Sequence, residues 1–199
     1  MESRMVGIML YNDVEVLDFA GPFEVFSIAE PQGGEAPPFK VVTISETGSL
    51  VSARNGLKIQ PDYGIADAPG LDILIIPGGP GFYEIETRNQ RVIDWIADQA
   101  GKLDMVASVC TGAFLLAKAG LLKGRKATTH WAHLERLASQ YPDITVLRDI
   151  KFVDEGSIIT SAGVSAGIDM SLYLVSKLVG EQAAINTARR MEYTPSGKP

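Results

Sequence analysis

The sequence has few residues of the kinds that build disulfides, metal sites and membrane spans. It contains one cysteine, Cys110, and only two histidines, His130 and His133, among 199 residues. A single cysteine excludes an intramolecular disulfide, and two histidines without a nearby third ligand are a poor metal site. No apolar run approaches the roughly 18 residues that a membrane-spanning helix needs. We therefore expect neither a metal ion nor contact with a membrane.

Basic residues are fewer than acidic residues. The 18 Lys and Arg residues against 24 Asp and Glu give a formal net charge of −6, which opposes attraction to phosphate backbones and predicts no nucleic-acid partner. The N-terminal stretch lacks the apolar region and cleavage site of a secretory signal, so we expect a cytoplasmic protein. Because no repeat, low-complexity tract or linker interrupts the chain, one domain over residues 1–199 is expected.

Short β-branched apolar runs alternate with segments of helical period, which is typical of an α/β fold with helices on both faces of a sheet. A Pro- and Gly-rich loop is expected at Pro31–Pro38, and a hairpin at Leu50–Ile59 turning near Gly56. The expected strands are Met5–Leu10, Phe39–Ile44, Ile73–Ile76, Met105–Val109, Lys126–Thr129, Ile144–Leu147, Lys151–Val153 and Ile158–Thr160. The expected helices are Val14–Ala29, broken near Gly21 and Pro22, then Asn89–Ala100, Gly112–Ala119, Ala132–Tyr141, Ala166–Val179 and Glu181–Met191.

Cys110 lies between a strand and a helix with no residues to spare for a loop. It must therefore occupy a sharp, strained turn, which is the geometry of a nucleophile elbow. The positive end of the following helix would favour the thiolate over the thiol and lower the pKa of Cys110. The alternative is a small buried hydrophobic residue, the commoner fate of a lone cysteine, and the elbow context favours the reactive interpretation.

Three segments leave strands toward one edge of the sheet: the region of Asp18, the loop Pro77–Gly81 and the elbow itself. We expect them to converge on one pocket. The N–H groups of Gly78 and Gly79, with that of Thr111, could hold a negative charge that develops during attack, although a plain turn is an alternative.

Asp18 is set among apolar neighbours, so burial should raise its pKa and keep the acid neutral near pH 7. A neutral carboxyl group can donate a hydrogen bond to a thiolate and later transfer its proton to a substrate. A helix cap or a solvated acid is the alternative for Asp18. His130 ends a predicted strand at the same edge and could line the site or a subunit contact.

Four motifs together resemble the DJ-1/PfpI superfamily, with its class I glutamine amidotransferase-like domain, over nearly the whole chain: LDFAGPFEVF, IIPGGPG, SVCTGAFLLAKAGLLKGRKATTHW and ITSAGVSAGID. Within it, LDxxGP, Cys-Thr-Gly, ATTHW and MEYTP resemble the isocyanide (isonitrile) hydratase branch and the sensor domains of AraC-type regulators. The resemblance implies a flavodoxin-like three-layer sandwich with a mostly parallel sheet. It also implies that Cys110 is the nucleophile, Asp18 the acid partner and Thr111 a neighbouring site group. Gly78 and Gly79 would supply the two backbone donors.

The sequence departs from two other groups of this superfamily. Thr111 stands where the protease and glyoxalase-like branches have a histidine, and the chain stops at Pro199 without room for a helix-turn-helix module. We therefore expect a stand-alone domain. The resemblance to the isocyanide hydratase branch implies that it hydrates isocyanides to N-substituted formamides, a reaction that requires no metal or organic cofactor. Phe82 and Tyr83 are candidate residues of the pocket wall. Asp18 and Thr111 could position the water molecule that is added to the isocyanide.

Other functions remain open. A ligand or redox sensor would use the same pocket and Cys110, and an activity on α-oxoaldehydes of the glyoxalase or deglycase kind is the second enzymatic candidate. The partners implied are a small-molecule substrate and a second copy of the chain in a homodimer, because closed two-fold dimers are the commonest oligomers and relatives pair near the elbow.

Overall fold

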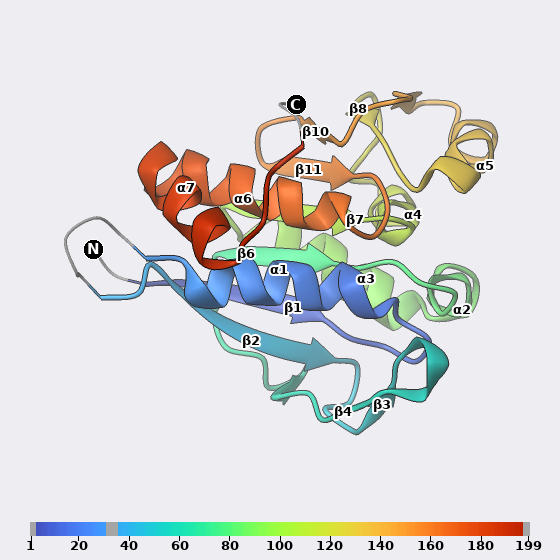
Figure 1. Cartoon of the computed structure of the whole chain (residues 1–199). Coiled ribbons are helices and arrows are strands. Elements are labelled where there is room, and N and C mark those ends of the chain that lie inside the picture. Colours follow the sequence, from blue (N-terminus) through green and yellow to red (C-terminus); the bar gives the residue numbers. More distant parts are fainter. Residues whose placement is uncertain (1–2, 31–35, 197–199) are drawn as a thin grey trace.

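A seven-stranded sheet forms the centre of the fold in the computed structural model, which describes residues 3–30 and 36–196 (Figure 1). The strand order is β10-β11-β7-β6-β1-β2-β5, and every neighbouring pair is parallel except β10 with β11. The prediction of a mostly parallel α/β sheet is confirmed. The strands are β1 (Arg4–Met9), β2 (Phe39–Ser45), β5 (Tyr63–Gly64), β6 (Ile73–Ile76), β7 (Met105–Val109), β10 (Phe152–Asp154) and β11 (Ile158–Ser161).

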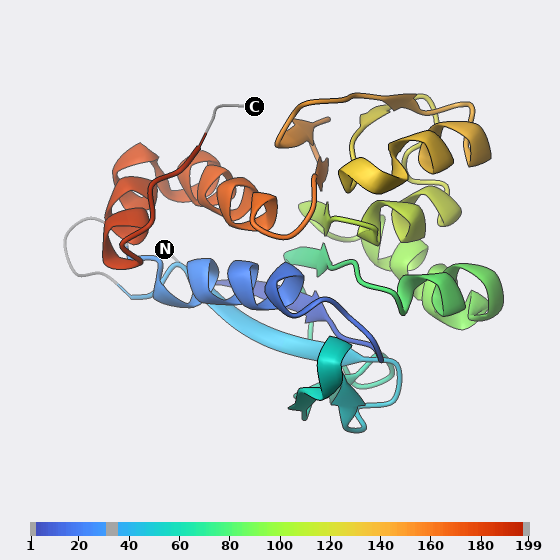
Figure 2. The same ribbon diagram turned by 45° about the vertical axis from the view of Figure 1, so that its right-hand side comes forward.

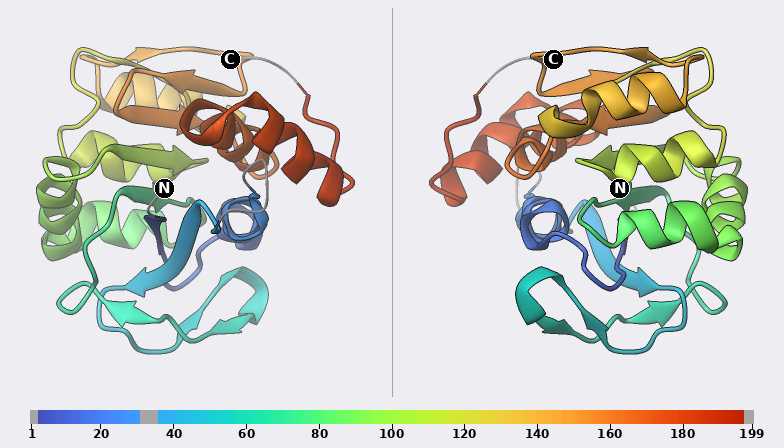
Figure 3. Two further views of the ribbon diagram at one scale, coloured as in Figure 1. Left: turned by 90° about the vertical axis from the view of Figure 1, so that its left-hand side faces the viewer. Right: turned by 90° about the vertical axis from the view of Figure 1, so that its right-hand side faces the viewer.

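Helices cover both faces of this sheet (Figure 3). One face carries α1 (Val16–Ile28), α6 (Ala166–Val179) and α7 (Glu181–Arg190), and the other carries α2 (Phe82–Arg88), α3 (Gln90–Ala100) and α4 (Gly112–Lys118). Because both faces are covered, every residue of β6 and β7 is buried, which explains why β6 is entirely apolar and β7 is apolar apart from Ser108. None of the helices within the described residues is long and apolar enough to cross a bilayer.

The predicted break in the first helix is wrong, because α1 runs without interruption through Pro22. Proline has no N–H, so the carbonyl of Asp18 one turn earlier loses its helical partner. Burial of Pro22, Val25 and Phe26 keeps the helix whole despite that loss. Gly21 serves close packing rather than a break: a Cβ there would lie 2.9 Å from Cγ1 of Ile168, so α1 and α6 approach closely (Figure 2).

Two small sheets lie outside the main one. The predicted hairpin is present, with β3 (Val51–Ser52) antiparallel to β4 (Lys58–Ile59). The expected strands Lys126–Thr129 and Ile144–Leu147 are shorter than predicted. Only β8 (Lys126–Ala127) and β9 (Thr145–Val146) form, and they pair with each other in parallel rather than with the central sheet.

The sequence patterns miss two elements and misplace the start of another. The helix α2 and the two-residue strand β5 were not expected, since both are too short to show a clear period. A 3-10 turn at Trp131–His133 precedes α5 (Leu134–Gln140), where a single helix was expected. Five residues of the predicted loop Pro31–Pro38, 31–35, lie outside the described residues.

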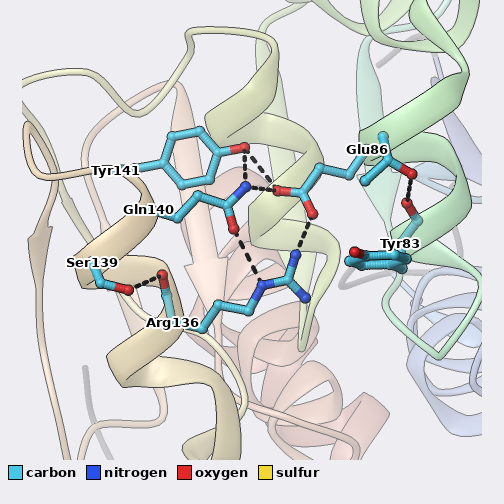
Figure 4. Close-up of polar contacts among 7 residues, drawn as sticks. Tyr83, Glu86, Arg136, Ser139, Gln140 and Tyr141 are labelled. Carbon is cyan, nitrogen blue, oxygen red and sulfur yellow. Dashed lines mark hydrogen bonds and ion pairs between the residues drawn. The ribbon is translucent and has the colours of Figure 1, made fainter.

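A buried carboxylate fastens α2 to α5 (Figure 4). The side chain of Glu86 is 2% exposed and accepts hydrogen bonds from Arg136 Nη2 at 2.7 Å, Gln140 Nε2 at 2.7 Å and Tyr141 Oη at 2.8 Å. Burial and the neighbouring Glu86 raise the pKa of Tyr141 well above its usual range, so its hydroxyl stays a donor. The guanidinium of Arg136 also lies 5.2 Å from the centre of the Phe82 ring. This cluster joins the segment after the Pro77–Gly81 loop to the segment after His130.

Candidate active site

The nucleophile elbow predicted at Cys110 is present. Cys110 follows β7 directly, has φ 57, and leads through Thr111 into α4. A non-glycine residue in this left-handed region carries a conformational cost, which the surrounding structure must offset. The backbone N–H of Cys110 donates to the carbonyls of Ser161 at 3.1 Å and Ala162 at 3.2 Å. These bonds to the end of β11 fix the strand side of the elbow.

Asp18 faces the thiol from the first turn of α1. Its side chain is fully buried, and its two oxygens accept from the amides of Gly78 at 3.0 Å and Val164 at 3.1 Å. The carboxyl group also makes a hydrogen bond with the thiol of Cys110. The loop Pro77–Gly81 and the elbow therefore meet at Asp18, as the sequence predicts, and Val164, to which the sequence does not point, joins them there.

The charge state of Asp18 differs from the expectation in degree. Burial raises the pKa of its carboxyl group to about 6, against the opposing effect of the Gly78 amide. The direction agrees with the prediction. The rise in pKa is too small to keep the acid neutral, because a group with a pKa of about 6 is mostly ionised at pH 7. Asp18 is therefore mainly a carboxylate that accepts hydrogen bonds.

The charge state of Cys110 is opposite to the expectation. Burial raises the pKa of the thiol to about 12, and the negative charge of Asp18 acts in the same direction. The backbone N–H and the hydroxyl of Thr111 both donate to the sulfur and lower its pKa, but they do not outweigh burial. The predicted thiolate is thus replaced by a thiol that donates to Asp18. The pair still holds one mobile proton, which resides on sulfur.

The backbone amides of Gly78 and Gly79 have different partners from those expected. Gly78 donates to Asp18, and Gly79 donates to Oγ1 of Thr111 at 3.0 Å, so neither amide is free to hold a charge on a substrate. Both glycines are needed for close approach. A Cβ on Gly78 would lie 2.5 Å from the nitrogen of Thr111, and one on Gly79 would lie 2.2 Å from the nitrogen of Glu15. The loop orients the acid and the threonine.

The remaining predicted residues lie at different distances from this centre. The ring of His130 packs on Gly163, next to the residue whose amide holds Asp18, so His130 borders the site. Phe82 and Tyr83 belong instead to the cluster around Arg136, whose guanidinium lies 5.2 Å from the centre of the Phe82 ring and 5.0 Å from that of Tyr83. Figure 4 shows Tyr83 beside Arg136. Their role as residues of the pocket wall stays a prediction.

Sequence reasoning missed three residues that shape the site. Val164 has φ 53, which is unusual for a β-branched residue, and presents its amide to Asp18. Thr129 donates its hydroxyl to the carbonyl of Cys110 at 2.7 Å, and Tyr11 donates to the carbonyl of Pro77 at 2.7 Å. Val164 and Thr129 fall inside the motifs ITSAGVSAGID and ATTHW, so their place in these motifs was the only available signal.

Metal ligation finds no support in the part of the chain that the structure describes. Across residues 3–30 and 36–196, no three His, Cys, Asp or Glu side chains come together as a group able to hold a metal ion. His130 and His133 lie with ring centres 5.9 Å apart, and burial lowers the pKa of both.

The chain is thus an α/β sandwich with a mostly parallel sheet, in which a cysteine with a left-handed backbone conformation faces a buried carboxyl group. The DJ-1/PfpI family model matches residues 4–177, and the chain belongs to this family. Among curated proteins, the isonitrile hydratase of Pseudomonas putida is 33% identical over 194 residues, which covers 98% of this chain and 80% of that protein. The family resemblance inferred from the motifs is confirmed.

Transcription regulators are also similar to this chain. The HTH-type transcriptional regulator GbdR of Pseudomonas aeruginosa is 30% identical over 179 residues, covering 90% of this chain but only 48% of the regulator. Among solved structures, a ThiJ/PfpI family protein from Pseudomonas syringae has a TM-score of 0.85 and 28% identity, covering all of this chain and 78% of that one. This chain spans about half the length of the regulator GbdR.

Proposed function

We propose that the protein hydrates isocyanides to N-substituted formamides, with Cys110 as nucleophile and Asp18 as the group that moves protons. The observation that carries the proposal is the hydrogen-bonded pair of a strained thiol and a buried carboxylate. The similarity to an isonitrile hydratase over 98% of the chain supports the choice of substrate class. The reaction class is that of a carbon-oxygen lyase acting on a small molecule.

In the first step the sulfur attacks the terminal carbon of the isocyanide. The S–H bond breaks as the S–C bond forms, and the proton moves to the Asp18 carboxylate. The carbon then carries an electron pair, to which Asp18 returns the same proton. The product is a thioimidate, S–CH=N–R, joined to Cys110, and Asp18 is again a carboxylate. The resting protonation of the pair, with the proton on sulfur, suits this order of events.

In the second step water adds to the thioimidate carbon. Asp18 accepts a proton from the water and passes the same proton to the nitrogen, which gives a tetrahedral carbon bearing OH, sulfur and NH–R and leaves Asp18 again a carboxylate. The C–S bond then breaks, the carbonyl of the formamide forms, and the hydroxyl proton returns to the sulfur. The net change adds one water to the isocyanide, so atoms balance without a metal or an organic cofactor.

Thr111 fits a supporting role at the sulfur. Its N–H and hydroxyl both donate to Cys110, and its hydroxyl oxygen is itself held by Gly79. Charge on the departing sulfur would be stabilised by these two donors as the C–S bond breaks. The elbow, through Thr111, and the Pro77–Gly81 loop, through Gly79, would then both contribute to the second step.

Formamide production from a panel of alkyl and aryl isocyanides tests this function. We expect turnover by the wild-type protein and none by Cys110→Ser, which keeps the shape but offers a weaker nucleophile. A wild-type protein that consumes none of the panel would contradict the proposal.

Ligand sensing is a second candidate, favoured by the similarity to the regulator GbdR over 90% of this chain. A sensor would bind a small molecule beside Cys110 without converting it. Calorimetry with the same panel separates the two functions: binding of an isocyanide that returns unchanged from wild-type protein supports sensing, whereas release of the formamide supports catalysis.

We also propose that the protein forms a homodimer in the cytoplasm. Large apolar side chains are exposed on α1, at Leu17 and Phe23, and on the 3-10 turn, at Trp131, and a second copy of the chain would cover some of them. A reducing compartment would keep Cys110 available. Sedimentation at micromolar concentration is expected to give twice the chain mass of 21.4 kDa, and a monomer would contradict the proposal.

A further inference from the structure

A buried hydroxyl stands behind the nucleophile elbow. Thr129 follows the short strand β8 and is 1% exposed, and its Oγ1 donates to the carbonyl oxygen of Cys110 at 2.7 Å. The two residues are 19 positions apart, so this contact depends on the tertiary fold. The mechanism proposed above gives Thr129 no part.

The carbonyl of Cys110 has no other short partner among the described residues. An ideal helix would supply the N–H of Phe114, but that N–H donates to the carbonyl of Thr111 at 3.0 Å. The N–H of Ala113 reaches the Cys110 carbonyl only at 3.4 Å. Buried carbonyl groups are rarely left without a good partner, so the hydroxyl of Thr129 fills a position that the helix leaves open.

The bond to Thr129 also bears on the sulfur, through one peptide group. The carbonyl of Cys110 and the N–H of Thr111 belong to the same planar peptide and point in opposite directions. Hydrogen bonding by that N–H is one of the effects that lower the pKa of the Cys110 thiol. A hydrogen bond accepted at the carbonyl fixes the plane of the peptide and polarises it, which strengthens the bond that its N–H donates.

We propose that Thr129 is a positioning residue for the nucleophile: its hydroxyl holds the Cys110–Thr111 peptide so that the Thr111 N–H points at the sulfur and stabilises negative charge there. This role deepens the proposed function, on which its catalytic meaning rests. The effect on the sulfur itself does not depend on the substrate.

The neighbouring residue shows that Thr129 is not needed merely to anchor its own segment. The N–H of Thr128 donates to Oγ1 of Thr160 at 2.9 Å, and the Thr128 hydroxyl donates to the carbonyl of Leu147 at 3.0 Å. These bonds fasten the segment to β11 and to the end of β9. Thr128 is buried to the same degree as Thr129 and is therefore a matched control.

The test measures the alkylation of Cys110 by iodoacetamide between pH 6 and pH 10 in four proteins: wild type, Thr129→Val, Thr129→Ser and Thr128→Val. Cys110 is the only cysteine, so the alkylation rate reports on it alone. For Thr129→Val we expect the rate to fall about three- to tenfold at each pH of the series, which corresponds to a rise of about 0.5–1 in the pKa of the thiol. Thr129→Ser and Thr128→Val should remain within about twofold of wild type, because each keeps the hydroxyl bond to Cys110.

Equal rates in Thr129→Val and wild type, or equal losses in Thr129→Val and Thr128→Val, would overturn the proposal. If Thr129→Val does not fold, as judged by its thermal transition, Thr129→Ala takes its place and is read in the same way. Isocyanide turnover is measured alongside. Lack of wild-type turnover together with a rate loss confined to Thr129 would reject the proposed function and leave the role of Thr129 supported. Normal turnover with unaltered alkylation in Thr129→Val would reject only the role of Thr129.

Discussion

Cys110 and Val164 both adopt left-handed backbone conformations, with φ 57 and φ 53, and both address the carboxyl group of Asp18. Cys110 supplies the thiol, and Val164 supplies its backbone amide. Conformations of this kind cost of order 1–3 kcal/mol each and are retained where a site depends on them. Two such residues at one carboxyl group indicate that the surrounding fold fixes the position of Asp18.

Asp18→Asn is expected to reduce isocyanide turnover by about 10²- to 10⁴-fold, the range that acid–base catalysis supplies. The amide keeps the shape of the side chain but neither accepts the thiol proton nor returns it to carbon. Substrate binding should change less than turnover, because the side chain remains in place. Steady-state kinetics measure this split, and an Asp18→Asn protein with a wild-type kcat would remove Asp18 from the mechanism.

The pH dependence of the rate should follow the Asp18 carboxylate. Its pKa of about 6 predicts that kcat/KM rises with pH through this value, since the first step needs the ionised form to receive the thiol proton. The rise should be absent from the residual activity of Asp18→Asn. A wild-type profile that is flat between pH 5 and pH 8 would contradict the assignment.

Asp18 should also make the stability of the protein depend on pH. Because its pKa is raised from 3.8 to about 6, the folded state binds its proton more tightly than the unfolded state does. The stabilisation is complete below pH 3.8 and is lost as the pH rises through 6. Asp18→Asn lacks this pH-dependent loss. The difference in free energy of unfolding, variant minus wild type, should therefore increase by about 2 kcal/mol from pH 4 to pH 7. Urea unfolding at both values measures the difference, and any constant effect of the amide cancels.

Gly78→Ala should damage the site more than the fold. The added Cβ would lie 2.9 Å from Oδ2 of Asp18 and 2.5 Å from the nitrogen of Thr111, so these groups must shift. We expect at least a tenfold loss of kcat/KM, because small displacements of catalytic groups have large effects on rate. Gly70→Ala is the matched control: nothing lies within 4 Å of its Cβ, and its activity should stay at the wild-type level. Similar activities in the two variants would contradict the close contact.

Glu86→Ala should destabilise the protein by about 3 kcal/mol, because it leaves Arg136 and Tyr141 without their buried partner. The control is Glu84→Ala in the same helix, whose exposed pair with Arg88 at 3.5 Å should change stability by no more than about 0.5 kcal/mol. Chemical denaturation of both variants measures the contrast. Equal effects would show that burial adds nothing to the Glu86 cluster (Figure 4).

The sequence predicts those parts of the site that depend on neighbouring positions in the chain. The strand-to-helix junction at Cys110 is visible because β7 and α4 are adjacent, and the acidic residue of the first helix is visible among its apolar neighbours. The partners of Gly78 and the hydroxyl contact of Thr129 are not, because each depends on a contact made by tertiary packing. The location of the shared proton also escaped prediction, since it depends on how completely the thiol is buried.

The hydrogen bond from Val164 to Asp18 joins residues that are 146 positions apart. Closing so long a loop is entropically costly, and folds dominated by distant contacts form slowly. The site can exist only after the first helix has met the turn that follows β11, so no partly folded form carries it. During refolding, local helix formation should therefore precede the recovery of turnover. Recovery of turnover in a refolding mixture would therefore report that Val164 has reached Asp18, a contact between residues 146 positions apart.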